Sequence, residues 1–473
     1  MKRKRAWWFI GGFALIVALV TFVFMSQREH PDYKRAAKRL PEARRQAEEL
    51  IGPMTWAEYR KERGVEASDD LDDWIALEAS IPQVFQEYDD SRRAGSTTIK
   101  IEYVFSASRE WLLSLAPRVE PLRLTRPKMS GGLYDWTGED TRSSSAVARR
   151  LPLLLVGAAD AGDVPAVKEA ARIAWMIFER QIEEYDLGSM MISDGGLAGM
   201  EENIVLAAVR NRDDSEVMST LRDIMADRPK RPPFREAVFG EARTFAPLIE
   251  QIRSLKPSEI DDWLNEWVGS MVEYPDGDVL SAWIRSSLRK LRDDEPFSNR
   301  RVGRHTAAAL EARYWEAMVE CAELSDHLSY TDSDGHLRLA ELGAFFDSYA
   351  DRSYELAAIF IPIGTADFSN RYLALGDARE IGLELISRYP SLEDLPATLP
   401  EDLVAPDAFG GGPLLYRKTP HGFLIYTRYR NRVDDGFIPL SADYYEIEAR
   451  SRRSVDAKDW GLIVSYDDPN PLP

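Results

Sequence analysis

The chain has 473 residues, of which 44% are hydrophobic and 10% aromatic, a composition typical of folded protein with sizeable cores. The formal charge is −19; removing the four basic residues at positions 2–5 leaves 56 of the 60 Lys and Arg against 79 Asp and Glu, a net of −23. Such a surface repels nucleic-acid phosphates, so we expect no nucleic-acid partner. Cys321 is the only cysteine, which excludes an intrachain disulfide and a zinc site made of cysteines.

The first feature along the chain is an apolar segment, residues 6–25, without a charged side chain. Twenty helical residues rise about 30 Å, the thickness of a bilayer's hydrocarbon core. Trp7 and Trp8 lie where an interfacial aromatic belt would be, and the basic tail 1–5 favours a cytoplasmic N-terminus. We therefore expect one transmembrane helix at 6–25 in the cytoplasmic (inner) membrane, with the body extracytoplasmic.

Two alternatives to this uncleaved anchor stay open. A cleaved signal peptide would have a shorter apolar region, about 7–15 residues, followed by small residues. In this chain the apolar segment ends in the bulky residues Phe24 and Met25. A prepilin leader would be cut after Gly12, because Gly12-Phe13 resembles the cleavage point of type IV pilins and pseudopilins. That family carries a glutamate five residues into the mature helix, where this chain has Val17.

Residues 26–150 are expected to form a juxtamembrane stalk followed by an N-terminal helical region. Segment 29–52 is charged, with loosely helical apolar spacing interrupted by Pro41, as in a stalk. Segment 68–88 has the three-four rhythm of an amphipathic helix, and the alternating apolar residues of 99–105 predict a strand.

Residues 151–395 are expected to form an irregular array of helical hairpins. A helix capped by Asp163 and ended by Gly188 comes first, and the proline-rich segment 228–233 divides the later helices into two groups. Further helices are predicted at 197–209, 217–225, 258–271, 279–292, 306–324, 337–350 and 368–388.

The last region, 396–473, is expected to be a small β-containing module. Strands are predicted at 414–416, 423–429 and 462–466, separated by Gly-, Pro- and Asp-containing turns. The expected fold class is therefore mainly α: a transmembrane helix, an array of helical hairpins and a small C-terminal β module.

One segment fits part of a calcium-binding loop. If Gly335 is the sixth position, Asp332, Asp334 and Glu341 fall on the third, fifth and twelfth, where carboxylates bind calcium. Tyr330 occupies the first position, which removes one expected carboxylate. The alternative, which we favour, is a polar turn followed by a helix with acidic residues at its start.

No residue pattern assigns a catalytic role. Pairs of adjacent aspartates are spread along an acidic chain, which favours solvated surface over general acid–base pairs. The sequence contains no G-x-S-x-G, H-E-x-x-H, G-x-x-x-x-G-K-[ST] or G-x-G-x-x-G motif.

The C-terminal region resembles the ending of a large uncharacterised family of planctomycete-type, membrane-anchored bacterial proteins. The likeness lies in Leu399–Tyr416, Gly422–Tyr426 and Val433–Gly436, and extends to Ala159–Asp163 and Ala237–Glu241. This resemblance implies an N-terminal anchor and an alanine-rich helical middle; the family has no assigned activity.

The same C-terminal pattern is also similar to the globular end of type II secretion major pseudopilins, in which an aspartate-glycine loop binds calcium. This resemblance implies Asp434 and Asp435 as candidate ligands, although Ala408 and Phe437 depart from the pattern. The alternative, which we favour, is a tight turn between strands.

Taken with the anchor, these features predict a non-catalytic interaction or scaffolding protein of the cell envelope. Its partners would be the membrane, through residues 6–25, and other envelope proteins. A pseudopilin-like secretion or assembly component is the first alternative, and an envelope hydrolase is the second. Calcium is the one cofactor that the sequence suggests.

Overall fold

We analysed a computed structural model of the chain. It describes residues 31–64, 70–94, 99–124, 139–183, 186–232, 234–256, 259, 305–325, 364–407, 412–428, 434 and 460–467. The predicted transmembrane segment 6–25 lies outside these residues. Within them, no helix combines the length and apolarity needed to cross a bilayer.

The chain divides into two compact units. The smaller unit contains residues 1–55, 245–321 and 347–361, and the larger contains 56–244, 322–346 and 362–473.

The described part of the smaller unit comprises α2 (Pro31–Ala37), α3 (Leu40–Ile51), most of α16 (Thr306–Ser325) and the second half of α13 (Phe234–Ser254). Ala43, Ala47 and Ile51 recur at i, i+4 and i+8 and form the buried face of α3. The segment expected as a stalk is thus a pair of helices, α2 and α3, with buried residues of its own.

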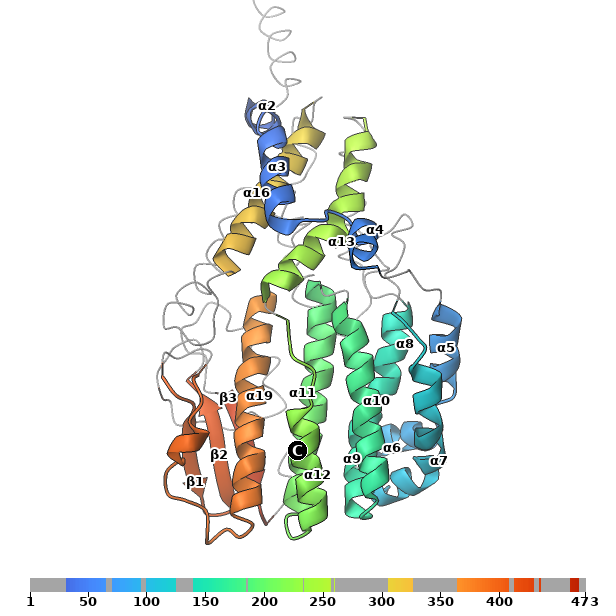
Figure 1. Cartoon of the computed structure of the whole chain (residues 1–473), viewed down its shortest axis with the longest axis vertical. Helices are drawn as coiled ribbons and strands as arrows, with labels where there is room; N and C mark the ends of the chain where they lie inside the picture. The colour runs from blue at the N-terminus through green and yellow to red at the C-terminus, as the bar shows by residue number, and fades with distance from the viewer. Residues whose placement is uncertain are drawn as a thin grey trace, which may run out of the picture. The chain divides into compact units, whose positions relative to one another are not determined.

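The larger unit is mainly helical, as predicted, and carries a small antiparallel sheet (Figure 1). Helices α9, α10, α11, α12 and α19 lie side by side in Figure 1, and α19 separates α11 from the sheet. The helices of this unit are α4 (Trp56–Arg63), α5 (Leu71–Ala79), α6 (Val84–Arg93), α7 (Ile101–Val119), α8 (Glu139–Ala148), α9 (Leu151–Asp160), α10 (Val164–Glu183), α11 (Leu187–Arg210), α12 (Ser215–Ala226), the first half of α13, and α19 (Gly364–Arg388).

Aspartates begin three of these helices. The carboxylates of Asp163, Asp186 and Asp214 accept hydrogen bonds from free backbone N–H groups at the starts of α10, α11 and α12. Gly162 precedes Asp163 with φ of 67°, a left-handed conformation that ends α9. The Ala159–Asp163 stretch is therefore a helix end followed directly by a helix start.

The sheet contains β1 (Leu415–Thr419), β2 (Gly422–Thr427) and β3 (Trp460–Ser465), antiparallel and in that order. Phe423, Ile425 and Val464 belong to the same core as α19. A Cβ at Gly382 of α19 would lie 2.6 Å from Leu462 Cδ2, so a larger residue here would displace the end of the Leu462 side chain where β3 crosses this helix.

Three details of the prediction were wrong. Residues 101–105 begin α7 and are not a strand, because the burial of Val104, Ser108 and Leu112 continues at helical spacing beyond the short alternating run. Segment 68–88 contains two helices, α5 and α6, with Pro82 between them. Gly188 does not end a helix but lies in the first turn of α11.

Candidate functional site

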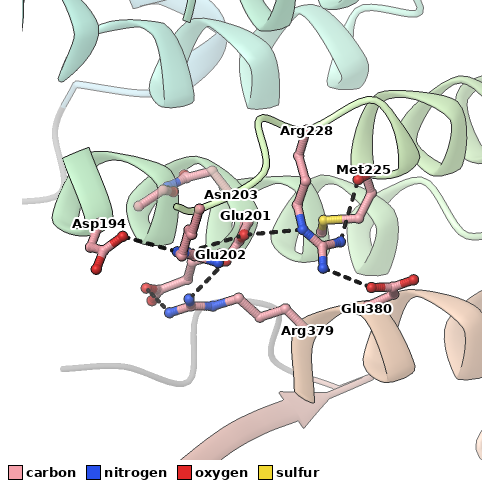
Figure 2. Close-up of polar contacts among 10 residues, drawn as sticks. Asp194, Glu201, Glu202, Asn203, Met225, Arg228, Arg379 and Glu380 are labelled. Atoms are coloured by element: carbon pink, nitrogen blue, oxygen red, sulfur yellow. Dashed lines mark hydrogen bonds and ion pairs between the residues drawn. The ribbon is translucent and has the colours of Figure 1, made fainter. Parts of the chain in front are cut away.

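The centre of the larger unit holds a cluster of buried charges that we call the ion cluster. It contains Asp194, Glu201 and Glu202 of α11, Arg379 and Glu380 of α19, and Arg228 and Arg231 of the connector, residues 227–232 between α12 and α13 (Figure 2). Asp377 of α19 lies within electrostatic range of Arg228, Arg231, Glu201 and Glu380. Three segments that are distant in sequence therefore meet at one point.

Glu201 is the centre of the ion cluster and is fully buried. Its Oε2 accepts a hydrogen bond from Arg379 Nη1 at 3.3 Å, and its Oε1 lies 3.3 Å from Arg231 Nη2. Arg228 Nε is 3.6 Å from the same Oε1. One carboxylate thus faces three guanidinium groups, two of which, on Arg231 and Arg379, are less than 10% exposed.

Asp194 lies two helical turns before Glu201, on the same face of α11. Arg231 Nε donates a hydrogen bond to Asp194 Oδ1 at 3.1 Å. Two carboxylates at the rim complete the arrangement: Glu380 accepts from Arg228 at 2.8 Å, and Glu202 lies 3.6 Å from Arg379.

A glycine allows the helices to approach here. A Cβ at Gly376 of α19 would lie 3.1 Å from Arg231 Nη1 and 3.5 Å from Glu201 Oε2. The distance to Arg231 is tighter than an ordinary van der Waals contact, so the absence of a side chain at position 376 leaves room for this guanidinium group.

Burial changes the protonation chemistry of two acids, Asp194 of the cluster and the neighbouring Asp377. Loss of hydration raises the pKa of Asp194 to about 6, although the adjacent Arg231 acts in the opposite direction. Loss of hydration also raises the pKa of Asp377 to about 6, opposed by Arg228 and supported by Glu380. We take desolvation as the dominant cause because Asp194 is almost completely buried and its Oδ2 accepts no hydrogen bond from the described residues.

Chemically, the ion cluster is a many-membered salt bridge that joins α11, α19 and the connector. Buried pairs contribute little net stability compared with apolar packing, but removing one member leaves an uncompensated buried charge, which is costly. The arrangement therefore fixes which segments meet more than it adds to stability.

The metal-site residues predicted from the sequence fall mostly outside the described residues. This holds for Asp332, Asp334, Glu341 and Asp435. Asp434 is described: it is exposed and accepts a hydrogen bond from Tyr426 Oη at 3.2 Å. The described part of the chain contains no group of three or more His, Cys, Asp or Glu able to hold a metal ion.

Residues of the C-terminal motif have structural contacts. The buried carboxylate of Asp407 accepts hydrogen bonds from Thr427 Oγ1 and from the backbone N–H of Arg428 at 2.9 Å. Tyr416 Oη donates to the carbonyl of Pro396 at 2.8 Å. These contacts join the loop after α19 to both strands of the β1–β2 hairpin.

Among the adjacent aspartate pairs, Asp70 and Asp214 have structural contacts. Asp70 accepts from the backbone N–H of Arg123 at 2.7 Å, and Asp214 caps α12. Of the histidines, His421 lies on the surface with its Nδ1 2.8 Å from Asp467 Oδ2.

The ion cluster was not identified from the sequence, although a signal was present. Asp194 and Glu201 lie seven residues apart on a face of α11 that also carries the buried Leu197 and Met200. Carboxylates within an apolar stripe need buried cations, and the connector, noted only for its prolines, supplies two.

Comparisons with protein-family models, with curated proteins and with solved structures found no match to this chain.

Proposed function

We propose that this chain is a membrane-anchored interaction or scaffolding protein of the cell envelope, held by residues 6–25. A strip along α7 carries this proposal. Seven exposed positions lie on one side of the helix, bordered by the exposed charges of Glu102, Arg109 and Arg118. Only Glu110 among the seven is charged; they are Tyr103, Ser106, Ala107, Glu110, Leu113, Ser114 and Pro117.

The two large residues of this α7 strip are well exposed: Tyr103 by 59% and Leu113 by 41%. Large apolar side chains exposed on a surface favour protein association. Because the body carries a large negative charge, we propose a protein partner with an apolar patch edged by basic side chains.

The test is site-specific photo-crosslinking of the full chain in its native membrane. A photoreactive residue at position 103 or 113 should give discrete protein adducts that position 223, exposed on α12, does not give. Leu113→Asp should remove the adduct formed at position 103. Identical adducts at all three positions, or adducts insensitive to this substitution, would reject the α7 strip as the interface.

The anchor is tested separately. Retention of the chain in membranes after alkaline extraction supports a transmembrane segment, and its loss on deletion of residues 6–25 assigns the anchoring to that segment. Extraction of the intact chain by alkali would contradict the membrane part of the proposal.

A pseudopilin-like assembly component is a second candidate, supported by the Gly12-Phe13 pair and the resemblance at Leu399–Tyr416. It requires cleavage after Gly12. Mass spectrometry of the native N-terminus decides between the two candidates, because an intact residue 1–12 segment excludes the pseudopilin pathway.

A further inference from the structure

We propose that helix α2 binds the anionic headgroups of membrane phospholipids through Lys34 and Lys38. This inference rests on the proposed anchor at residues 6–25, because that anchor holds α2 beside a bilayer.

Charge is distributed unevenly along the chain. Residues 26–40, which follow the predicted anchor, carry five Lys and Arg against two Asp and Glu, a net of +3. Residues 41–473 carry 51 Lys and Arg against 77 Asp and Glu, a net of −26. An anionic bilayer therefore repels the body as a whole but attracts the short segment nearest to it.

The length of the chain sets the distance between α2 and the bilayer. Five residues, 26–30, separate the predicted anchor from Pro31, the first residue of α2. Because an extended residue spans at most about 3.6 Å, Pro31 lies within about 20 Å of Met25. The headgroup layer extends beyond the hydrocarbon core, and electrostatic attraction reaches about 8 Å further at physiological ionic strength. The cations of α2 are therefore within reach of the headgroup phosphates.

Packing determines which side of α2 is free. Tyr33 and Ala36 are buried together with Ala309 of α16. Lys34 and Lys38 are exposed, four residues apart, so they do not contribute to this contact. The side of α2 that carries the two lysines faces solvent.

These lysines differ from their basic neighbours in having no acidic partner. Arg39 donates two hydrogen bonds to Glu316, and both arginines of α3 pair with glutamates of the same helix. Within the part of the chain that the structure describes, neither Lys34 nor Lys38 lies at ion-pair distance from a carboxylate. Both charges are therefore available to a ligand.

The chemistry of these side chains fits lipid phosphates. An ammonium group is a compact charge with three donors, so it binds a phosphate oxygen without the fixed two-point geometry that an arginine prefers. Each lysine close to an anionic bilayer should raise the affinity about 5-fold. An acidic protein offers similar charges, but the bilayer is an anionic surface whose distance from α2 is limited by the chain itself.

Lysine acetylation of the full chain in lipid nanodiscs is the first measurement. The discs contain phosphatidylcholine, with or without anionic phosphatidylglycerol, and mass spectrometry gives the acetylation rate of each lysine. Lys34 and Lys38 should react about 5-fold more slowly in the anionic discs, and high salt should remove this protection because it screens the attraction. Lys61 and Lys168, exposed in the larger unit, should react equally in both. Equal rates for Lys34 and Lys38 in the two kinds of disc would overturn the proposal.

Substitution provides the second measurement. In the full chain, Lys34→Gln combined with Lys38→Gln should reduce the preference for phosphatidylglycerol over phosphatidylcholine at least about 5-fold, measured in neutral detergent by native mass spectrometry of bound lipid. Lys61→Gln combined with Lys168→Gln removes the same charge elsewhere and should leave this preference unchanged. An equal reduction in both double variants would assign the preference to overall charge and reject α2 as the binding surface.

Vesicle sedimentation separates failure of this proposal from failure of the anchor. A chain inserted through residues 6–25 stays with vesicles of either composition after washing with salt, whereas a chain held by α2 alone stays with anionic vesicles and is released by salt. Retention by both kinds of vesicle without slower acetylation of Lys34 and Lys38 rejects the α2 surface and supports the anchor. Release from both at low salt rejects both.

Discussion

The two units each contain a buried glutamate but surround it differently. In the larger unit, Glu201 faces arginines that are themselves largely buried. In the smaller unit, Glu311 of α16 is 2% exposed and accepts hydrogen bonds from Arg253 and, at 3.4 Å, from Trp315 Nε1. Arg253 is 45% exposed, so water still hydrates the cation.

From this difference we expect the loss of stability on removing a buried carboxylate to depend on whether its partner cations are buried or hydrated. Removal of Glu311 would leave Arg253 in contact with water, whereas removal of Glu201 would leave three guanidinium groups inside the protein. Four experiments test this comparison.

The largest effect is expected for Glu201→Gln. Loss of the central charge should reduce the free energy of unfolding of the larger unit by about 3–5 kcal/mol, because the remaining buried cations lose their main counter-charge. Local opening of α11, followed by hydrogen exchange, is the measurement. Glu202→Gln, at the adjacent and 45% exposed position, is the matched control and should cost less than about 1 kcal/mol.

Glu311→Gln should have an intermediate effect. It removes charge-assisted hydrogen bonds but leaves a hydrated arginine, so we expect a loss of about 1.5–3 kcal/mol in the smaller unit, measured by hydrogen exchange of α16. If this variant costs as much as Glu201→Gln, hydration of the cation is not what separates the two sites.

A smaller effect is expected for Gly376→Ala. The new methyl would press on Arg231, which is fixed by two carboxylates, and we expect a net loss of about 1 kcal/mol despite the higher helix propensity of alanine. The matched variant is Gly199→Ala on α11, where nothing lies within 4 Å of the added Cβ. It should gain about 0.5–1 kcal/mol. Thermal and denaturant unfolding of the two variants should shift in opposite directions.

The smallest effect is expected at an exposed ion pair of the smaller unit. Arg39 donates two hydrogen bonds to Glu316, at 2.6 and 3.0 Å, but is itself 53% exposed. Arg39→Ala should therefore cost less than about 1 kcal/mol, and the cost should fall further in high salt. A loss of stability comparable to that of Glu311→Gln would show that the energetic contribution of these ion pairs does not follow their burial.

The sequence predicted the helices of the larger unit better than its polar centre. The apolar stripe and the capping Asp163 were sufficient to predict α10. Three apolar runs were sufficient to predict β1, β2 and β3. Local periodicity determines such elements, since each buries a continuous face. The run at 99–105 was wrongly predicted as a strand. Four alternating apolar residues are too few to separate the two-residue period of a strand from the 3.6-residue period of a helix, and the residues after them show the helical period.

The ion cluster could not be predicted in the same way because its members come from three segments. Nothing local to Arg379 indicates that it meets Glu201, 178 residues earlier. The spacing of Asp194 and Glu201 could have shown that buried acids exist, but not which cations compensate them. Contacts of this kind depend on the packing of α11 against α19, which brings together residues that are distant in sequence.

The order of the strands has a consequence for biosynthesis. β3 follows every other described element in the chain, so α19 and the β1–β2 hairpin leave the ribosome before their partner strand. Until β3 arrives, the hydrogen-bonding edge of β2 and the Gly382 side of α19 lack the strand that covers them. A nascent chain paused in this interval presents an open strand edge, which is a template for aggregation and a substrate for chaperones.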